Sequence, residues 1–104
     1  MSVHAFRMQL KPGALAEYRR RHDEIWPDLS QLLKESGIGD YRIFVDAQSG
    51  ALFAVLTLSE TNSRDSLPFH PVMRRWWDYM AELMVVDETN RPTEWPLEEV
   101  FHLP

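Results

Sequence analysis

The stretch Ala51-Leu-Phe-Ala-Val-Leu-Thr-Leu58 decides how this chain folds. It is apolar at nearly every position and follows a glycine, which is typical of a β-strand that begins after a turn. Because successive side chains of a strand point to opposite faces, Phe53 and Val55 share one face and the leucines share the other. Both faces are apolar, so we expect both to be covered in the folded protein.

Further strands are predicted on either side of this stretch. Tyr41 to Asp46 forms a strand before it, and Ala47-Gln-Ser-Gly50 between the two suits the turn of an antiparallel hairpin. His4 to Leu10 alternates apolar and polar residues, which predicts a third strand. Glu99 to Leu103 is predicted to be a short fourth strand at the end of the sequence.

Two segments have helical spacing of their apolar residues. They are Ala14 to Lys34 and Pro71 to Met84. Pro27 lacks the N–H that a continuous helix needs, so we expect a kink or a new helix start at that residue. The resulting order, β-α-β-β-α-β, predicts an α+β fold of the ferredoxin-like type, with a four-stranded antiparallel sheet and helices on one face.

The second face of this sheet needs a cover that two helices on one side cannot supply. Left in water, it would form a larger apolar patch than soluble monomers normally tolerate. We expect a second copy to pack sheet against sheet, which gives a homodimer with a dimeric α+β barrel. The alternative is that segment 59–71 or 85–97 folds over that face.

Composition excludes several classes of protein. The chain has 104 residues, 44% of them hydrophobic, which predicts one domain over residues 1–104. The formal net charge of -5 disfavours a nucleic-acid partner. No apolar run approaches the roughly 20 residues of a membrane span, no signal peptide is recognisable, and there is no cysteine for a disulfide. We expect a cytoplasmic protein that binds neither membranes nor nucleic acid.

Three consecutive arginines at 19–21 are the only strongly basic feature. On a helix they fan over most of the circumference, and each has an acidic residue four positions away. A solvated, ion-paired helix surface is therefore favoured over a nucleic-acid site, with these pairs: Glu17 with Arg21, Arg19 with Asp23, and Arg20 with Glu24.

Tyr18 and His22 interrupt the apolar stripe of the first helix. They are four residues apart and so lie on one helix face. Two polar-tipped rings that face a sheet need hydrogen-bond partners, which either the protein core or a ligand can supply. His22 is the best candidate for a general acid or base, because an imidazole exchanges its proton near neutral pH.

Trp76 and Trp77 point about 100° apart on the second helix. One can pack in the core while the other lines a cleft, where an indole face suits the C–H-rich side of a sugar. Tyr41 begins a strand and could close the same space. The four histidines have no metal-type spacing, and no phosphate-binding glycine loop is present, so we expect no metal and no cofactor.

Several segments together resemble the L-rhamnose mutarotase family across the whole length. The matching segments are Glu17-Tyr-Arg-Arg-Arg-His22, Ile25-Trp-Pro-Asp-Leu29, Arg75-Trp-Trp77, Phe6–Leu10, Asp40–Phe44, Leu52–Ala54, Tyr79-Met80 and Glu99–Pro104. The specific part is Arg20-x-His22-x-x-Ile25-Trp26-Pro27 together with the tandem Trp76-Trp77. The resemblance implies an isomerase of rhamnose metabolism, with His22 as proton donor. It also implies that the sugar is contacted by Tyr18, Tyr41, Trp76 and Trp77.

Two other functions remain compatible with the residues alone. One is a cofactor-free monooxygenase or haem-degrading protein of the dimeric α+β barrel group. The other is a non-catalytic module that binds a small ligand. Haem binding or oxygen consumption by the pure protein would indicate the first, and sugar binding without anomer exchange would indicate the second.

Overall fold

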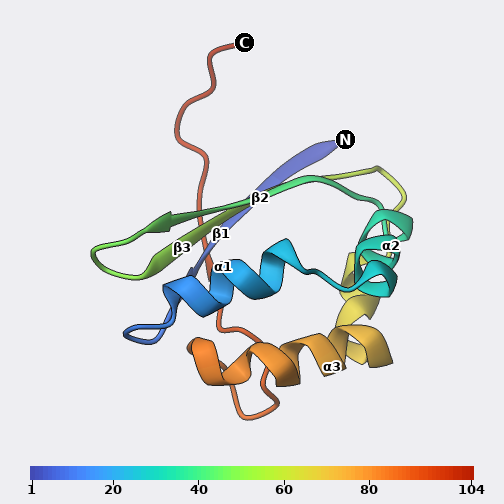
Figure 1. Cartoon of the computed structure of the whole chain (residues 1–104). Helices are drawn as coiled ribbons and strands as arrows, with labels where there is room; N and C mark the ends of the chain where they lie inside the picture. Colours follow the sequence, from blue (N-terminus) through green and yellow to red (C-terminus); the bar gives the residue numbers. More distant parts are fainter.

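Strand β3 (Ala51–Leu58) is an inner strand of a four-stranded sheet in the computed structural model, which describes residues 1–104. The strand order is β2-β3-β1-β4 and every pairing is antiparallel, as Figure 1 shows for the longer strands. The other strands are β1 (Ser2–Gln9), β2 (Ile38–Asp46) and β4 (Trp95–Pro96). This sheet, with helices on one face, confirms the predicted α+β class.

The helices all lie on one side of the sheet (Figure 1). They are α1 (Leu15–Asp23), α2 (Pro27–Glu35), α3 (Pro71–Met80) and the short 3₁₀ helices η1 (Arg64–Phe69) and η2 (Ala81–Leu83). Pro27 starts a new helix as predicted, because extended backbone at Trp26 (φ -62°, ψ 131°) separates α2 from α1. None of these helices is long and apolar enough to span a lipid bilayer.

The core lies between the helices and the sheet face that carries the leucines of β3. Leu52, Ala54 and Leu56 are almost completely buried there, together with Phe6 and Met8 of β1. The opposite face remains largely open. Neither segment 59–71 nor segment 85–97 covers it, since η1 packs on the helix side and β4 pairs along the edge of β1.

The prediction of a strand at Glu99–Leu103 is wrong. The chain pairs with β1 earlier, at Trp95–Pro96, where the Arg7 guanidinium lies 4.2 Å from the centre of the Trp95 ring. The Leu97 N–H donates to the Ala5 carbonyl at 3.0 Å, and the chain then leaves the sheet (Figure 1). In this register most of residues 99–103 would run past the start of β1, so no strand of the same chain is available to them.

Two of the three predicted ion pairs on α1 form. Arg20 binds Glu24, and Arg21 binds Glu17 at 2.7 Å. The predicted pair of Arg19 and Asp23 does not form; both residues border a pocket instead. The guanidinium of Arg21 is buried. It also donates hydrogen bonds to the Tyr79 carbonyl in the last turn of α3 and to the Glu82 carboxylate in η2, each at 2.6 Å. Arg21 therefore joins α1 to α3.

Candidate active site

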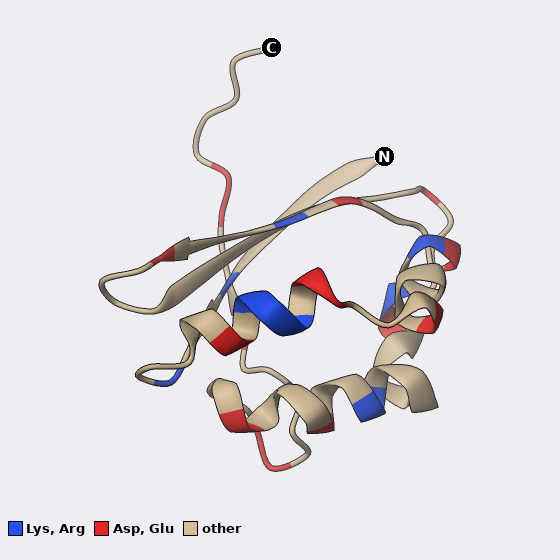
Figure 2. Cartoon of the chain, viewed as in Figure 1, with Lys and Arg blue, Asp and Glu red and all other residues tan.

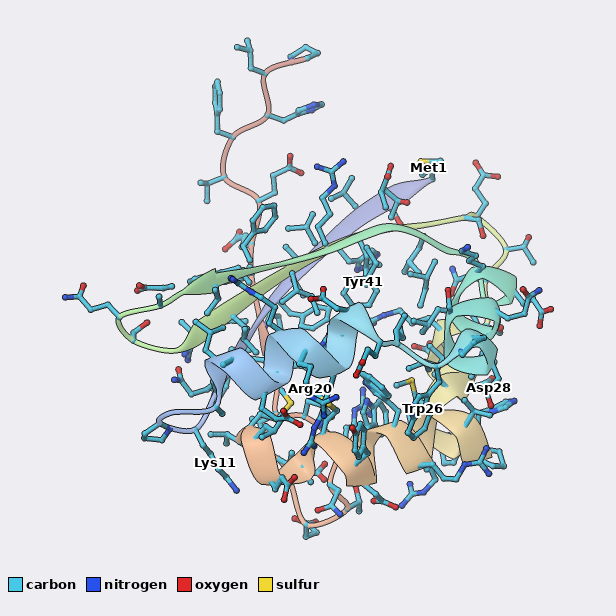
Figure 3. The ribbon with its side chains drawn as sticks, viewed as in Figure 1. Met1, Lys11, Arg20, Trp26, Asp28 and Tyr41 are labelled. Carbon is cyan, nitrogen blue, oxygen red and sulfur yellow. The ribbon has the colours of Figure 1, made fainter.

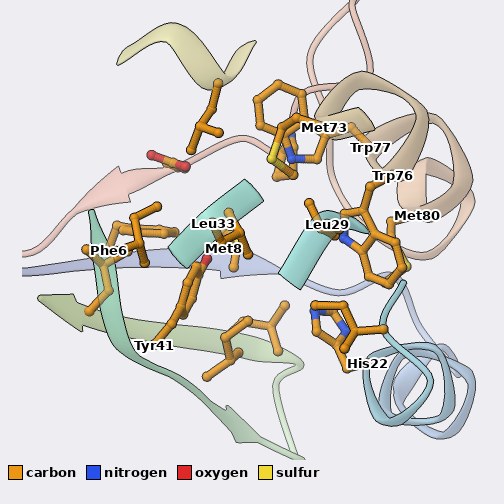
Figure 4. Close-up of a pocket in the computed structure, with 18 of the residues that line it drawn as sticks. Phe6, Met8, His22, Leu29, Leu33, Tyr41, Met73, Trp76, Trp77 and Met80 are labelled. Carbon is orange, nitrogen blue, oxygen red and sulfur yellow. The ribbon is translucent and has the colours of Figure 1, made fainter. Parts of the chain in front are cut away.

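A cavity of about 700 Å³ lies between the sheet and the helices. Its size is within the range of roughly 300–1,000 Å³ that is usual for small-molecule sites. Figure 4 shows His22 and Trp76 at one end and Tyr41 beside Phe6 at the other. The cavity brings together all five residues that the sequence marked: Tyr18, His22, Tyr41, Trp76 and Trp77.

The His22 ring is held by the backbone of its own helix. Its Nδ1 lies 3.1 Å from the carbonyl oxygen of Tyr18, one turn earlier on α1. A carbonyl can only accept a hydrogen bond, so this contact assigns the proton of a neutral imidazole to Nδ1. The other nitrogen, Nε2, then carries a lone pair and has no protein partner. The ring is half-buried, in the wall of the cavity.

The surroundings of His22 favour its neutral form. Burial lowers the pKa of the imidazole below its usual value, because an imidazolium is poorly solvated there. The hydrogen bond to the Tyr18 carbonyl and the charge of Asp23 oppose this shift but do not cancel it. At neutral pH the Nε2 atom is therefore a proton acceptor.

Aromatic rings enclose the His22 end of the cavity. The centres of the Tyr18 and His22 rings are 4.3 Å apart, and Trp76 meets His22 edge to face at 5.5 Å. Trp76 is only 5% exposed and also packs edge to face against Trp26 at 5.1 Å. Trp77 is half-buried and lines the cavity with the Arg91 guanidinium 5.6 Å from its ring. Trp76 thus belongs to the core as well as to the cavity wall, whereas Trp77 is the more exposed of the two cavity-lining tryptophans.

An irregularity of strand β2 places Tyr41. The register of β2 against β3 shifts between Gly39 and Arg42, and Asp40 has a positive φ of 44°. This bulge inserts one extra residue, and Tyr41 then points from the sheet toward the helices (Figure 3). Figure 3 also shows Trp26 on the helix side, near α3.

Both tyrosines of the cavity keep their phenol protons. Burial raises the pKa of Tyr18, and the nearby Tyr41 raises it further. Burial also raises the pKa of Tyr41, to which the negative charge of Glu94 contributes. Neutral phenols donate and accept hydrogen bonds but do not abstract protons at neutral pH.

Arg64 and Glu94 also line the cavity, although no sequence pattern predicted either residue as part of a site. They belong to segments 59–70 and 85–97, which have no periodic pattern, and 30 positions separate them. Tertiary folding alone brings them to one site. The unpaired Arg19 and Asp23 border the cavity near His22.

Comparisons with known proteins show the family and support the fold. A family model described as L-rhamnose mutarotase matches residues 3–103. A protein named L-rhamnose mutarotase from Jannaschia sp. (strain CCS1) is 53% identical over 104 residues, which is 100% of both chains. One of the same name from Acidiphilium cryptum (strain JF-5) is 55% identical over 100 residues, or 96% of each chain. The crystal structure of an L-rhamnose mutarotase from Formosa agariphila has a TM-score of 0.93 and 39% identity, with 100% of both chains covered.

The chain belongs to the L-rhamnose mutarotase family.

Membership of the L-rhamnose mutarotase family confirms the resemblance seen in the sequence. It favours neither a monooxygenase or haem-degrading protein nor a non-catalytic module. The mutarotase relatives match this chain from end to end, so β1 and the C-terminal residues are part of the shared architecture.

Proposed function

We propose that this chain is an isomerase that interconverts the α and β anomers of L-rhamnose by opening and reclosing the pyranose ring. The observation that carries this function is the His22 imidazole, whose unpartnered Nε2 borders a cavity large enough for a monosaccharide. The names of the relatives support L-rhamnose as the substrate. The proposal treats residues 1–104 as one catalytic domain.

Ring opening transfers one proton between two oxygens of the same carbon. The anomeric hydroxyl O1 loses its proton, the C1–O5 bond breaks, a C1=O1 double bond forms, and O5 gains a proton. O1 and O5 are both bonded to C1, so one imidazole can reach both. Neutral His22 accepts the O1 proton at Nε2, and the resulting imidazolium donates it to the ring oxygen. Rotation about C1–C2 followed by the reverse transfer gives the other anomer.

In this scheme His22 is the proton donor that the family resemblance implied, but it acts as a base first. The order follows from the hydrogen bond of Nδ1 to Tyr18 and from the lowered pKa of the ring. Tyr18 and Tyr41, whose pKa values are raised, hold sugar hydroxyls by hydrogen bonds. A positioned acid or base contributes about 10²–10⁴-fold to a rate, which suffices for a reaction that also occurs slowly in water.

The two tryptophans contact the sugar in different ways. The face of Trp77 is the natural support for the methyl-bearing, apolar side of a 6-deoxy sugar. Trp76 is nearly buried, so its contribution is limited to the part of its ring beside His22. Neither contact restrains C1, so the C1–C2 bond remains free to rotate during the exchange.

A homodimer through the open sheet faces is part of the proposal. The open face carries Phe44 and Phe53 directly opposite each other on neighbouring strands, and Phe44 is 55% exposed. The tail after Leu97 exposes three further apolar side chains, Val100, Phe101 and Leu103. A second copy would cover both regions. The cytoplasm as its location remains a prediction from the sequence.

Charge adds support for this dimer. Arg7 and Arg42 lie on the open face, since each stands opposite a residue of β3 that points that way. The tail carries Glu98 and Glu99 beyond the sheet, where Figure 2 shows red above the blue positions of the strands. The tail of one copy and the sheet face of the other are therefore complementary in charge as well as in polarity.

The function is tested by NMR saturation transfer between the two anomeric protons of L-rhamnose. We expect the wild-type protein to accelerate the exchange well above the rate in buffer alone. His4→Gln, a change at an exposed histidine outside the cavity, is expected to retain that rate. Exchange at the buffer rate with folded wild-type protein would reject the function.

A further inference from the structure

Arg64 and Glu94 form a second polar group in the cavity, separate from His22. Arg64 begins η1 and Glu94 directly precedes β4. The Arg64 Nη2 and Glu94 Oε2 atoms are 3.8 Å apart, and the side chains are 27% and 29% exposed. Both residues line the cavity, and the guanidinium lies 5.7 Å from the ring centre of Phe6.

The hydrogen-bonding capacity of this pair is unfilled. A separation of 3.8 Å is too long for a hydrogen bond. Neither side chain makes a hydrogen bond with any other residue, whereas the buried Arg21 makes three. A carboxylate and a guanidinium that face a cavity without hydrogen-bond partners are ready to accept and donate hydrogen bonds to a ligand.

The pair stands at the end of the cavity away from His22. Figure 4 places Tyr41 and Phe6 at one end and His22 and Trp76 at the other. Arg64 lies near the Phe6 ring, and the charges of Glu94 and Arg64 both act on the pKa of the Tyr41 phenol. Tyr18 connects the two ends, because its ring touches His22 and its pKa responds to Tyr41.

We propose that Arg64 and Glu94 bind the vicinal hydroxyls at C3 and C4 of the sugar. This inference rests on the proposed function, which puts C1 at His22. In a pyranose, C3 and C4 form the diol most distant from C1 and O5. Each hydroxyl can donate to a Glu94 oxygen and accept from an Arg64 N–H, so a diol satisfies both partners at once.

Such a subsite explains how the enzyme can hold a sugar whose reacting end must move. Charged groups form the stronger hydrogen bonds of a binding site, and here they act on atoms that do not change during ring opening. The substrate is anchored at C3 and C4 while C1 rotates. The subsite also makes the enzyme selective for the presence and configuration of these two hydroxyls, since a missing hydroxyl leaves a charged group unpaired.

The test removes the same contact in two ways: by substitution of the side chain, and by use of a sugar that lacks the hydroxyl. For Glu94→Gln and Arg64→Gln we expect KM for L-rhamnose to rise about tenfold or more, the loss typical of a hydrogen bond to a charged group, with little change in kcat. For wild type, we expect KM for 4-deoxy-L-rhamnose to exceed KM for L-rhamnose by a factor of the same order. When a variant is tested with the deoxy sugar, KM should rise no further than with either change alone, because both changes remove the same contact. Glu88→Gln and Arg75→Gln, at exposed positions outside the cavity, serve as matched controls.

Calorimetric titration with L-rhamnose reads the same contacts without relying on turnover. If wild type binds the sugar but does not exchange its anomers, the proposed function fails while the subsite is still tested by the affinities. Glu94→Asp and Arg64→Lys, which keep the charges, are available if an uncharged variant does not fold. The subsite would be overturned if the variants bind L-rhamnose as tightly as wild type does. It would also be overturned if wild type binds the 3-deoxy and 4-deoxy sugars as tightly as L-rhamnose.

Discussion

Trp76 and Trp77 are neighbours in sequence, but their environments separate a structural role from a binding role. Trp76 is 5% exposed and packs against three other aromatic rings, of His22, Trp26 and Tyr79. Trp76→Ala should therefore lower the free energy of unfolding by about 3–5 kcal/mol. Trp77→Ala should lose much less stability and instead weaken sugar binding. Urea denaturation with calorimetric titration measures both, and equal effects of the two substitutions would contradict this division.

At the same scale, the sequence could predict only part of the cavity. Tyr18 and His22 were recognisable because two polar rings with helical spacing interrupt an apolar stripe. Tyr41 was recognisable only as the first residue of a predicted strand, and that start is wrong because β2 begins at Ile38 and has its bulge next to Tyr41. Arg64 and Glu94 could not be found, since each is one charged residue among many in an irregular segment. Local periodicity indicates residues on helices and strands, whereas the contacts between loops follow from the whole fold.

Among the elements, the bulge in β2 is the feature on which the site most depends. Asp40 occupies the left-handed region of backbone conformation (φ 44°). This conformation costs a β-branched residue about 1–2 kcal/mol in conformational energy. Asp40→Val should therefore lower the melting temperature and, by displacing Tyr41, raise KM. Asp40→Gly, which relieves the strain, should keep the wild-type KM and melt at the same or a higher temperature. A wild-type KM in Asp40→Val would show that the bulge does not position Tyr41.

The elements also show where sequence patterns are reliable. Helix breaks and inner strands were predicted well, because Pro27 and the apolar run 51–58 impose them locally. The last strand was misplaced, since alternation at 99–103 says nothing about whether a neighbouring strand is present. The chain pairs instead at Trp95–Pro96, where Arg7 and Trp95 stack. Edge strands depend on pairing partners that periodicity does not reveal.

For the whole molecule, the open sheet face is the main determinant of assembly. Phe44 is 55% exposed and contributes little to the fold of one chain. Phe44→Glu should therefore leave the secondary structure intact but convert a dimer to monomers, because it would bury a carboxylate in the apolar part of the interface, opposite Phe53. Sedimentation equilibrium measures the change, with Gln48→Glu in the exposed hairpin turn as control. A monomeric wild type, or a Phe44→Glu dimer of unchanged affinity, would argue against association through this face.

The pH dependence of kcat/KM for anomer exchange, with the buffer rate subtracted, tests the role of His22 most directly. The reaction needs neutral His22, and burial lowers its pKa below the usual 6.5. Wild type should therefore have constant kcat/KM from pH 7 to 8 and lose activity as the pH falls through that lowered pKa. His22→Gln should have a kcat/KM lower by about 10²-fold or more, and this kcat/KM should not fall further at acid pH. A wild-type rate that rises as the pH falls, or a His22→Gln variant as fast as wild type, would contradict a neutral imidazole as the proton carrier.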